Sequence, residues 1–583
     1  MPGQQKNEQH HYGFVVKKTN ILLVNPACQD KRITDDDARQ VPIGLYYIAA
    51  LLIENGYATR ILNLADTQDD PLTIFDQSVY DHKPALVGFS VTNPSRINAL
   101  ACAAIFKKKH PDIPVIFGGP GPTFLAEHLF EACPAIDFIV KGEGERTVLE
   151  LVKALETVKT DSDQPDPFKH IKGLVYKNAG QLVTTQERPC IENLDTLPHP
   201  SKYFAFNHLS MSRGCPGKCT FCGSPKFWAS KQVRFHSPDW MVEELFEQVK
   251  RGIFHFYICD DTFTMDQDRV IRFCNLIIDK KLQITWNAIS RVDYINTELL
   301  CAMRKAGCIQ ISFGVESGSS LIRKVLGKPI AQKTIIQAFE QTAAYGILTR
   351  AYFIYGSPGE THETIKDSIQ LLHKIKPLAA IFYMLVIFPG THLYQAARNK
   401  GLLTDDLWHE KIEDLPWFEI DDHLDFNMVK SFGDQLRSEF YSHLNQFALD
   451  LKLVDIKELY PFHADFLSRL ALTFSHGEYA DDSRVHSRQE TAMLLFEKAL
   501  HYAPEARAFL GMAMLLQKQR LFPKAIQTLT KGLSYFKDHK DLNICMGICL
   551  MNMGDFSQAL PFFEKFKSFA DADHYIQTCR KHL

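Results

Sequence analysis

Short apolar runs alternate with amphipathic stretches along residues 19–156. The run Ile21–Asn25 ends at Pro26, as expected for a strand covered on both faces, and Gly44–Asn55 has helical periodicity that closes at Gly56. The same pattern predicts strands at Thr59–Leu64, Leu86–Val91, Val115–Phe117 and Phe138–Val140, with helices at Ile97–Lys109 and Thr123–Phe130. We therefore expect an α/β fold that begins with a Rossmann-like, doubly wound parallel sheet.

A polar linker at 157–200 separates this domain from a second alternation with a longer repeat. The linker carries Asp161, Asp163 and Pro165, and two short runs, Gly173–Tyr176 and Leu182–Thr185, predict a hairpin. Within 201–400 we expect strands, each followed by a helix, at His208–Met211, His255–Ile258, Gln283–Ile289, Ile309–Gly314, Thr349–Tyr355 and Ala380–Ile387. Six such units predict a partial (β/α)6 barrel, with its chemistry at the carboxyl ends of the strands.

The remainder of the chain is expected to be helical. Residues 401–480 form an extension with an acidic stretch around Trp408 and Trp417, to which we assign no role. Residues 481–583 carry Ala492, Ala525 and Ala559 at spacings of 33 and 34 residues, each followed four residues later by an apolar side chain. This period resembles tetratricopeptide repeats, which implies a concave surface for a protein or peptide partner.

The composition describes an ordinary globular protein. The 583 residues are 45% apolar and 23% charged, with a formal net charge of −3, so nucleic acid is not an expected partner. The tail at 1–18 is polar, and the longest apolar run, Ala379–Phe388, is too short to span a bilayer. We therefore predict a cytoplasmic protein without a membrane span, whose cysteines lie in a reducing compartment.

The most specific motif is a loop between Ser212 and Gly223 with thiols at Cys215, Cys219 and Cys222. Three cysteines on one short loop suit a structural zinc ion or an iron–sulfur cluster, and buried free thiols are the alternative without a metal. A structural zinc ion needs four ligands, and His208 and His236 do not stand at zinc-finger spacing from the loop. A four-iron cluster held by three cysteines would keep one iron open for a small molecule.

This C-x3-C-x2-C loop, with Phe221 before the last cysteine, resembles the signature of the radical S-adenosylmethionine (radical SAM) enzymes. The resemblance implies a 4Fe-4S cluster on the three cysteines. Its open iron would bind S-adenosylmethionine, and one electron from a flavodoxin or ferredoxin would release a 5-deoxyadenosyl radical. By motif, the implied S-adenosylmethionine contacts are Phe221, Asp260, Asp261, Arg291, Glu316, Ser317, Gly356 and Pro358. Cys259 lies beside them at a strand end and could face the site, but we expect it to be a small buried core residue.

The strand ends of the first domain are rich in glycine and small polar residues. They contain no G-x-G-x-x-G fingerprint, so a nicotinamide cofactor is disfavoured. They resemble the cobalamin-binding domain that precedes many radical SAM domains, and the implied contacts are Pro42, Gly44, Leu45, Ser90, Thr92, Asn93, Gly118, Gly119, Gly142, Glu143 and Gly144. Because residues 19–155 lack a D-x-H-x-x-G motif, we expect no histidine on cobalt. A Rossmann-like domain without a cofactor is the alternative.

The combined resemblance, over residues 20–400, implies a cobalamin-dependent radical SAM enzyme. Its expected reaction is methylation of an unactivated carbon or phosphinate centre through methylcobalamin. The alternative reaction is an oxidation, cyclisation or rearrangement without methyl transfer, like that of the anaerobic magnesium-protoporphyrin cyclase. A scaffold with a vestigial cluster is a third hypothesis, which the intact cysteines disfavour.

Overall fold

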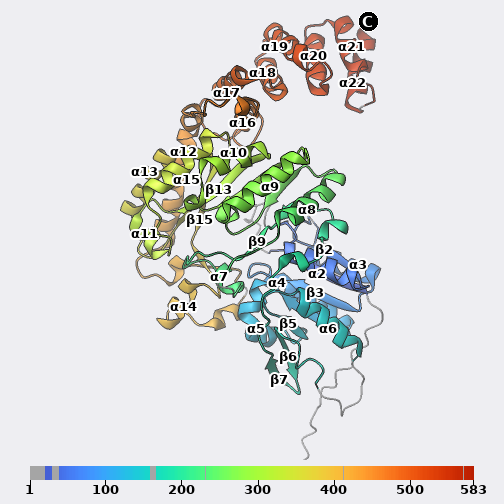
Figure 1. Cartoon of the computed structure of the whole chain (residues 1–583), viewed down its shortest axis with the longest axis vertical. Helices are drawn as coiled ribbons and strands as arrows, with labels where there is room; N and C mark the ends of the chain where they lie inside the picture. Colours follow the sequence, from blue (N-terminus) through green and yellow to red (C-terminus); the bar gives the residue numbers. More distant parts are fainter. Residues whose placement is uncertain are drawn as a thin grey trace, which may run out of the picture.

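The computed structural model describes residues 20–28, 39–67, 69–157, 166–229, 232–410, 412–568 and 570–583 (Figure 1). The predicted tail at 1–18 and the linker residues Asp161, Asp163 and Pro165 lie outside these ranges. Three parts follow one another along the long axis of the molecule. An α/β domain lies at one end, a parallel-sheet domain in the middle and an array of helices at the other end.

The first domain contains a seven-stranded sheet in the order β2-β1-β3-β4-β5-β6-β7. Its first five strands are parallel, and β6 and β7 add the predicted hairpin as antiparallel strands. The strands are β1 (Asn20–Asn25), β2 (Ala58–Asn63), β3 (Leu86–Ser90), β4 (Val115–Gly118), β5 (Phe138–Val140), β6 (Leu174–Asn178) and β7 (Gln181–Thr184). The helices are α2 (Ile43–Glu54), α3 (Pro71–His82), α4 (Arg96–Lys109), α5 (Pro120–Ala132) and α6 (Glu145–Thr157).

Helices cover both faces of this sheet, because its central strands are apolar on both sides. Ile21 and Leu23 of β1 pack into the core that α2 and α6 cover, whereas Leu22 and Val24 pack into the core under α3, α4 and α5. The connection from β1 to β2 runs through α2 on one face, and the connection from β2 to β3 runs through α3 on the other. Because the first five strands are parallel, their carboxyl ends lie at one edge, where such sheets bind ligands.

The middle domain has six parallel strands in the order β15-β14-β13-β12-β11-β8. The strands are β8 (His208–Leu209), β11 (His255–Ile258), β12 (Thr285–Ser290), β13 (Cys308–Glu316), β14 (Leu348–Tyr355) and β15 (Ala379–Met384). The helices are α8 (Pro238–Lys250), α9 (Gln267–Asp279), α10 (Thr297–Lys305), α11 (Ser320–Val325), α12 (Gln332–Ala344), α13 (His362–Ile375) and α14 (His392–Asn399). The sheet stays open between β8 and β15, as expected for a partial barrel.

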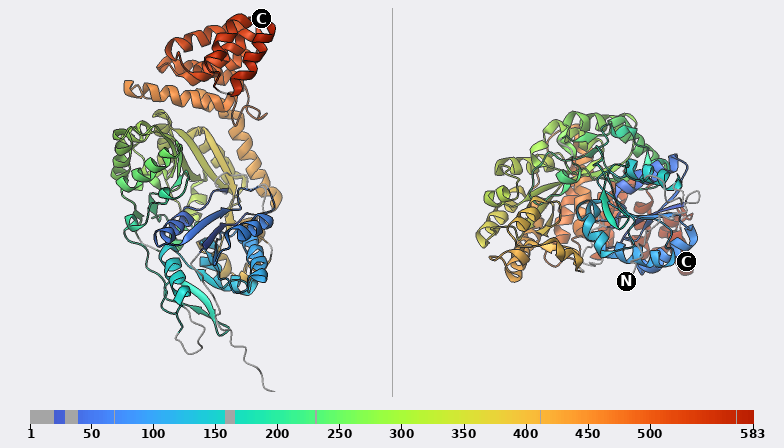
Figure 2. Two further views of the ribbon diagram at one scale, coloured as in Figure 1. Left: turned by 90° about the vertical axis from the view of Figure 1, so that its right-hand side faces the viewer. Right: turned by 90° about the horizontal axis from the view of Figure 1, so that it is seen from below.

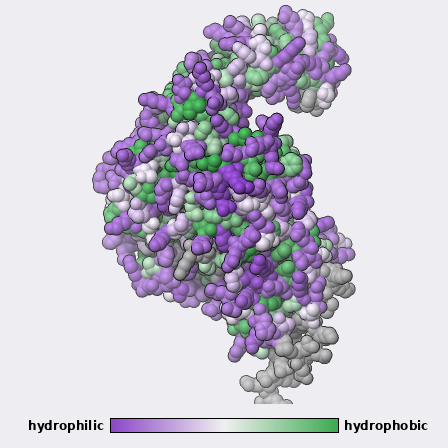
Figure 3. Space-filling model, viewed as in Figure 1, coloured by the Kyte–Doolittle hydropathy of each residue, from purple (hydrophilic) through white to green (hydrophobic). Residues whose placement is uncertain are grey.

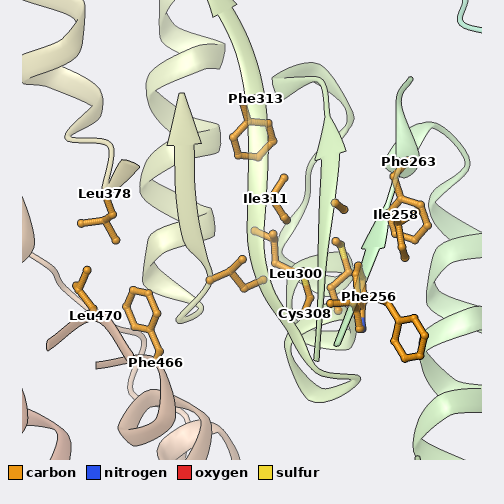
Figure 4. Packing of buried hydrophobic residues seen from close by; sticks show 14 of the residues in the cluster. Phe256, Ile258, Phe263, Leu300, Cys308, Ile311, Phe313, Leu378, Phe466 and Leu470 are labelled. Carbon is orange, nitrogen blue, oxygen red and sulfur yellow. The ribbon is translucent and has the colours of Figure 1, made fainter. Parts of the chain in front are cut away.

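Side chains on alternate positions of the barrel strands form its core with the outer helices. Ile311 and Phe313 of β13 lie in this core, close to Leu300 of α10 (Figure 4). Cys308 is fully buried among them, as expected for a core thiol. Phe466 of a later helix belongs to the same cluster, so the barrel core continues into the C-terminal helices.

The extension differs from the predicted run of helices. Residues 401–425 contain short 3-10 turns and a strand, β17 (Leu415–Pro416), which pairs with β16 (Val386–Ile387). Trp408 is buried there. Its indole Nε1 donates to the Tyr394 hydroxyl at 2.7 Å, and its ring stacks under the Arg96 guanidinium of α4 at 5.2 Å. This stretch therefore fastens the barrel to the first domain.

The C-terminal helices are antiparallel neighbours that extend beyond the barrel (Figure 2). After α15 (Phe426–Leu449) they are α16 (Tyr460–Ser475), α17 (Arg488–Tyr502), α18 (Ala506–Lys518), α19 (Phe522–Tyr535), α20 (Lys540–Asn552), α21 (Phe556–Glu564) and α22 (Ala570–His582). Ala492, Ala525 and Ala559 are fully buried between them. A Cβ on Gly511 would come within 2.1 Å of the Phe496 ring, so glycine allows these helices to approach closely.

On the face that Figure 3 shows, polar and apolar residues are interspersed, and the surface is hollowed between the helical array and the barrel. Over the described ranges, the helices are too short or too polar to cross a bilayer.

Candidate active site

The cysteine loop lies at the carboxyl end of β8, between β9 (Ser212–Arg213) and α7 (Ser224–Phe227). Its three thiols are half-buried, and Phe221 packs against the apolar cluster beneath the loop. Burial raises the pKa of the Cys219 thiol and raises that of Cys222 to about 11. Both are therefore neutral thiols at pH 7, and loss of their protons depends on a bound metal.

The loop folds around Gly217, and the space beside this glycine is bordered by groups that suit a cluster. A Cβ on Gly217 would lie 3.3 Å from Cys215 Sγ, 3.7 Å from Cys219 Sγ and 3.4 Å from Arg291 Nη1. Two thiols and a guanidinium therefore border the space beside Gly217, and three cysteines without a fourth cysteine or histidine ligand on the loop suit an iron–sulfur cluster better than a four-ligand zinc ion.

The barrel itself holds the loop in place. Thr220 N donates to Leu326 O at 3.0 Å, and its hydroxyl donates to Val325 O at 3.1 Å at the end of α11. Gly327 has a φ of +69°, and a Cβ there would lie 2.4 Å from Lys218 O. A side chain at 327 would therefore push the loop away, so glycine is required for the contact.

Two of the predicted S-adenosylmethionine residues lie beside this loop. Arg291, after β12, pairs with Asp293, and Glu316, at the end of β13, pairs with Lys328 Nζ at 2.7 Å. Lys328, Glu316 and Arg291 all act electrostatically on the Cys219 thiol. The structure thus places a buried ion pair and a second cation next to the cysteines. No motif in the sequence indicated Lys328.

The two aspartates after β11 point in different directions. Asp260 is only 2% exposed and accepts hydrogen bonds from Met211 N at 2.9 Å and from the Ser212 hydroxyl, and burial raises its pKa to about 7. Asp261 instead faces an interdomain cavity and accepts from Ser224 Oγ. Asp260 therefore stabilises the chain before the cysteine loop, and Asp261 is the one open to a ligand.

The predicted turn after β14 is also organised by a carboxylate. Glu360 accepts hydrogen bonds from Gly356 N at 2.5 Å and Ser357 N at 3.0 Å. Pro358 follows these two donors in the sequence and belongs to the same turn. Gly356 has a φ of +77°, and a Cβ there would approach Val429 of α15 to 2.9 Å. The predicted contact Ser317 is fully buried, and its hydroxyl accepts from Ser319 N, so it shapes the neighbouring turn.

Replacing Glu360 with glutamine is expected to flatten the pH dependence of stability. Burial raises the pKa of Glu360 from 4.5 to about 7, so the folded state favours the protonated carboxyl. That stabilisation is complete below pH 4.5 and is lost as the pH rises to 7, a change of up to about 3 kcal/mol. Thermal unfolding between pH 5 and 8.5 measures it. A Glu360→Gln protein with the same slope as the wild type would contradict the assignment.

A cavity of about 280 Å³ separates the first domain from the barrel. Nine of the eleven predicted cobalamin contacts line it: Pro42, Gly44, Leu45, Ser90, Gly118, Gly119, Gly142, Glu143 and Gly144. A Cβ on Gly44 or Gly142 would meet no atom within 4 Å, so bare backbone faces open space there. This wall of glycine and apolar residues at the strand ends fits a large, partly apolar cofactor.

Two predicted cobalamin contacts lie off the cavity. Asn93 is buried, and its amide donates to Glu413 O at 2.9 Å, which ties the first domain to the extension. The Thr92 hydroxyl lies 3.1 Å from Ser95 Oγ in the turn that leads into α4. Both residues therefore shape the domain rather than the cavity.

The barrel contributes the opposite wall of the cavity, including residues not predicted there. Cys259 is exposed and lines the cavity, so its prediction as a buried core residue is wrong; it follows the last residue of β11, beyond the core. Phe227 and Trp228, directly after the cysteine loop, line it as well. The residues that flank the cysteine loop, among them Arg213 before it and Trp228 after it, thus face the same space as the glycine-rich strand ends.

A buried ion-pair network joins the two walls. Arg213, two residues before Cys215, donates to Glu143 at 3.1 Å and Glu145 at 2.5 Å, and Arg234 donates to Glu143 at 2.7 Å. Burial alone lowers the pKa of Arg213, but the two carboxylates outweigh it and raise that pKa. The carboxylate of Glu143, predicted as a cobalamin contact, is therefore engaged in holding the domains together.

Comparisons with known proteins agree with this arrangement. Residues 209–372 match the family model of the radical SAM superfamily, and residues 37–152 match that of the B12 binding domain. An uncharacterized methyltransferase of Pyrococcus horikoshii is 34% identical over 411 residues, which are 68% of this chain and 86% of that protein. An anaerobic magnesium-protoporphyrin IX monomethyl ester cyclase of Rubrivivax gelatinosus is 30% identical over 62% of this chain and 66% of its own length.

The fold also matches a solved structure almost throughout. The cobalamin-dependent S-adenosylmethionine radical enzyme OxsB, with aqua-cobalamin and S-adenosylmethionine bound, superposes with a TM-score of 0.54 over 97% of this chain and 83% of that chain, at 18% identity. The chain therefore belongs to the radical SAM superfamily and carries the B12-binding domain of its cobalamin-dependent members.

Proposed function

We propose that the protein is a cobalamin-dependent radical SAM methyltransferase. The observation that carries the proposal is the shared cavity, onto which both the neighbourhood of the three-cysteine loop and the glycine-rich strand ends open. Relatives named as methyltransferases, from Pyrococcus horikoshii and Streptomyces wedmorensis, support methyl transfer as the reaction. The family's cofactors are a 4Fe-4S cluster, S-adenosylmethionine and cobalamin.

When bound, the cluster supplies the electron that cleaves S-adenosylmethionine, and cobalamin supplies the methyl group. Cys215, Cys219 and Cys222 would hold the cluster. The backbone of Gly118, Gly119, Gly142 and Gly144 would accept cobalamin. A flavodoxin or ferredoxin type of donor would deliver the electron, as the resemblance implies.

The chain's own charged residues account for binding S-adenosylmethionine beside the cluster. Arg291 and the Glu316–Lys328 pair adjoin Cys219. There the guanidinium of Arg291 suits the carboxylate of S-adenosylmethionine, and the Glu316–Lys328 pair suits its ribose and amino groups. Asp261 faces the cavity and suits a cationic group. The apolar wall of Phe227 and Trp228 excludes water, which strengthens these interactions and protects a radical from side reactions.

The proposal is tested by following a labelled methyl group. The reconstituted holoenzyme is incubated with hydroxocobalamin, a one-electron reductant, S-adenosylmethionine labelled in its methyl group, and a small-molecule extract of native cells. We expect deoxyadenosine and a labelled product, both dependent on reductant, with the product also dependent on cobalamin. An unlabelled product with a new ring or bond would instead favour the cyclase-type reaction named for the Rubrivivax gelatinosus relative. Absence of S-adenosylmethionine cleavage would reject both.

We further propose that α17–α22 are tetratricopeptide-like repeats that recruit a protein or a carrier-bound substrate. The 33- and 34-residue spacing of buried alanines and the antiparallel helices support this interpretation. The core of α17 is continuous with the barrel through Leu495 and Phe496, whereas α19–α22 form a separate apolar cluster with one face of α18. The distal helices are therefore the part that can be removed.

Truncation after Arg520 is expected to leave the enzyme folded. Uncoupled deoxyadenosine formation should stay within about twofold, since the barrel core is retained, while capture of the partner from a native extract should be lost. Gel filtration, deoxyadenosine assay and pull-down measure these effects. Aggregation of the truncated chain would favour a purely structural role, and an unchanged pull-down would defeat the recruitment proposal.

A further inference from the structure

Two histidines and a glutamate meet on the outer side of the barrel, away from the cavity. His373 lies in the last turn of α13, and Glu439 and His443 lie one turn apart on α15. His373 Nε2 is 3.2 Å from Glu439 Oε2. His443 Nδ1 is 3.5 Å from the same oxygen and 3.0 Å from the backbone Glu439 O, a contact that an ion would replace. One donor atom from each residue lies within 4.8 Å of the others. Three donors from two helices therefore converge on one point.

These separations suit the ligands of a single ion. Zinc binds histidine nitrogen and carboxylate oxygen at about 2.0–2.1 Å, so two ligands of a tetrahedral ion stand roughly 3.4 Å apart. The observed 3.2 Å and 3.5 Å lie on either side of this value. Two imidazoles and one carboxylate are a common zinc ligand set, which leaves a fourth position for water.

The surroundings allow the ligands to adjust and an ion to enter. The three side chains are 37–45% exposed, so solvent reaches them. The two imidazole rings are nearly perpendicular with centroids 4.5 Å apart, and both contact Phe447, a buried residue one helical turn beyond His443. The packing of both imidazole rings against Phe447 therefore limits the orientations that the two rings can adopt.

The position of the site suggests what a bound ion would do. The helix α15 begins against the turn at Gly356, where Val429 packs, and Gly433 lies against Tyr355 at the end of β14. The helix α13 begins just after that same turn. An ion shared by both helices would fix α15 against α13 about three helical turns beyond the predicted S-adenosylmethionine turn.

We propose that His373, Glu439 and His443 bind one zinc-type divalent ion with a water ligand, and that this ion clamps α15 to α13. The site is independent of the cysteine loop, because none of its residues lies near residues 212–223 in the sequence or belongs to the cavity wall. The proposal does not depend on the reaction that the enzyme performs.

The test uses the full-length protein with its 4Fe-4S cluster in place, so that the loop cysteines are occupied. Loosely held metal is removed by dialysis against a weak chelator, and zinc is titrated by calorimetry. Cobalt(II) is titrated in parallel for its visible absorption. We expect one equivalent of zinc, a tetrahedral cobalt spectrum and a raised unfolding temperature.

The matched variants are the double His373→Gln, His443→Gln protein and the single Glu439→Gln protein, with His423→Gln as a control at an exposed histidine outside the site. The double variant should lose the zinc equivalent and the cobalt spectrum. Glu439→Gln should weaken zinc binding by at least the roughly 10–100-fold that loss of an outer-sphere partner costs. His423→Gln should bind zinc like the wild type.

Two results would overturn the proposal. The first is a wild-type protein that binds no zinc, in which case the three residues form ion pairs only. The second is a double variant that binds zinc with wild-type stoichiometry and affinity, which places the ion elsewhere. Because the variants are compared without zinc as well, a folding defect appears as a lowered unfolding temperature in the metal-free protein.

Discussion

Replacing Cys215, Cys219 or Cys222 with alanine is expected to abolish cleavage of S-adenosylmethionine. Three cysteine thiolates are the only protein ligands that the loop offers to a cluster. Loss of one leaves two ligands, and a cluster with only two cysteine ligands is not retained. We expect deoxyadenosine formation to fall at least about 100-fold, the scale on which loss of an essential catalytic group acts. Iron content and deoxyadenosine after anaerobic reconstitution measure the effect.

The control for this experiment is Cys301→Ala. Cys301 lies on α10 in the same domain and is half-buried, like the loop cysteines, but it is remote from them in the sequence. Its replacement should leave both iron content and deoxyadenosine formation within about twofold, as expected for a conservative change outside the site. Wild-type activity in any of the three loop variants would reject the cluster assignment.

The strands and the cysteine loop were predictable because local pattern decides them. Apolar runs such as Ile21–Asn25 identify buried parallel strands, and three cysteines within eight positions are typical of a metal centre. The helix α3 went unpredicted, although Asp70 caps it and Pro71 occupies its first position. Its apolar residues are few, and only three of its residues are buried, so its periodicity is weak.

The partners of the predicted charged residues could not be deduced from the sequence. Lys328 reaches Glu316 only through the turn after α11, and nothing in the local pattern indicates that this turn returns to the loop. Likewise, the resemblance to cobalamin-binding domains implied that Glu143 contacts the cofactor, whereas its carboxylate pairs with Arg213 and Arg234 across the domain boundary. Contacts between distant segments depend on domain packing, which local periodicity does not encode.

The extension illustrates the same limit. Trp408 and Trp417 stand in an acidic stretch whose role was not predicted, and the structure buries both against other elements. Trp408 contacts Tyr394, which lies 14 residues before it, and Arg96, which lies in another domain. An aromatic residue in a polar stretch is therefore a signal of tertiary contact, but it does not identify the partner.

Replacing both Glu143 and Glu145 with glutamine is expected to loosen the two domains from each other. Arg213 is only 7% exposed and would lose both carboxylates, and breaking one side of a buried ion pair costs about 3–5 kcal/mol. At about 2–4 °C for each kcal/mol, the unfolding temperature should fall by roughly 6–20 °C. Because Glu143 and Gly144 line the cavity, retention of hydroxocobalamin on gel filtration should fall as well.

The matched control adds Arg213→Met and Arg234→Met to the two glutamine changes. Replacing a whole buried ion network with uncharged side chains of similar size is often neutral, so most of the lost stability should return. Retention of cobalamin should stay low, because methionine and glutamine do not impose the orientation that the paired charges give to the two walls of the cavity. If the variant with all four substitutions instead retains cobalamin like the wild type, the ion-pair network acts only on stability. If the glutamine double variant keeps both its unfolding temperature and its cobalamin, the ion pairs do not hold the domains together.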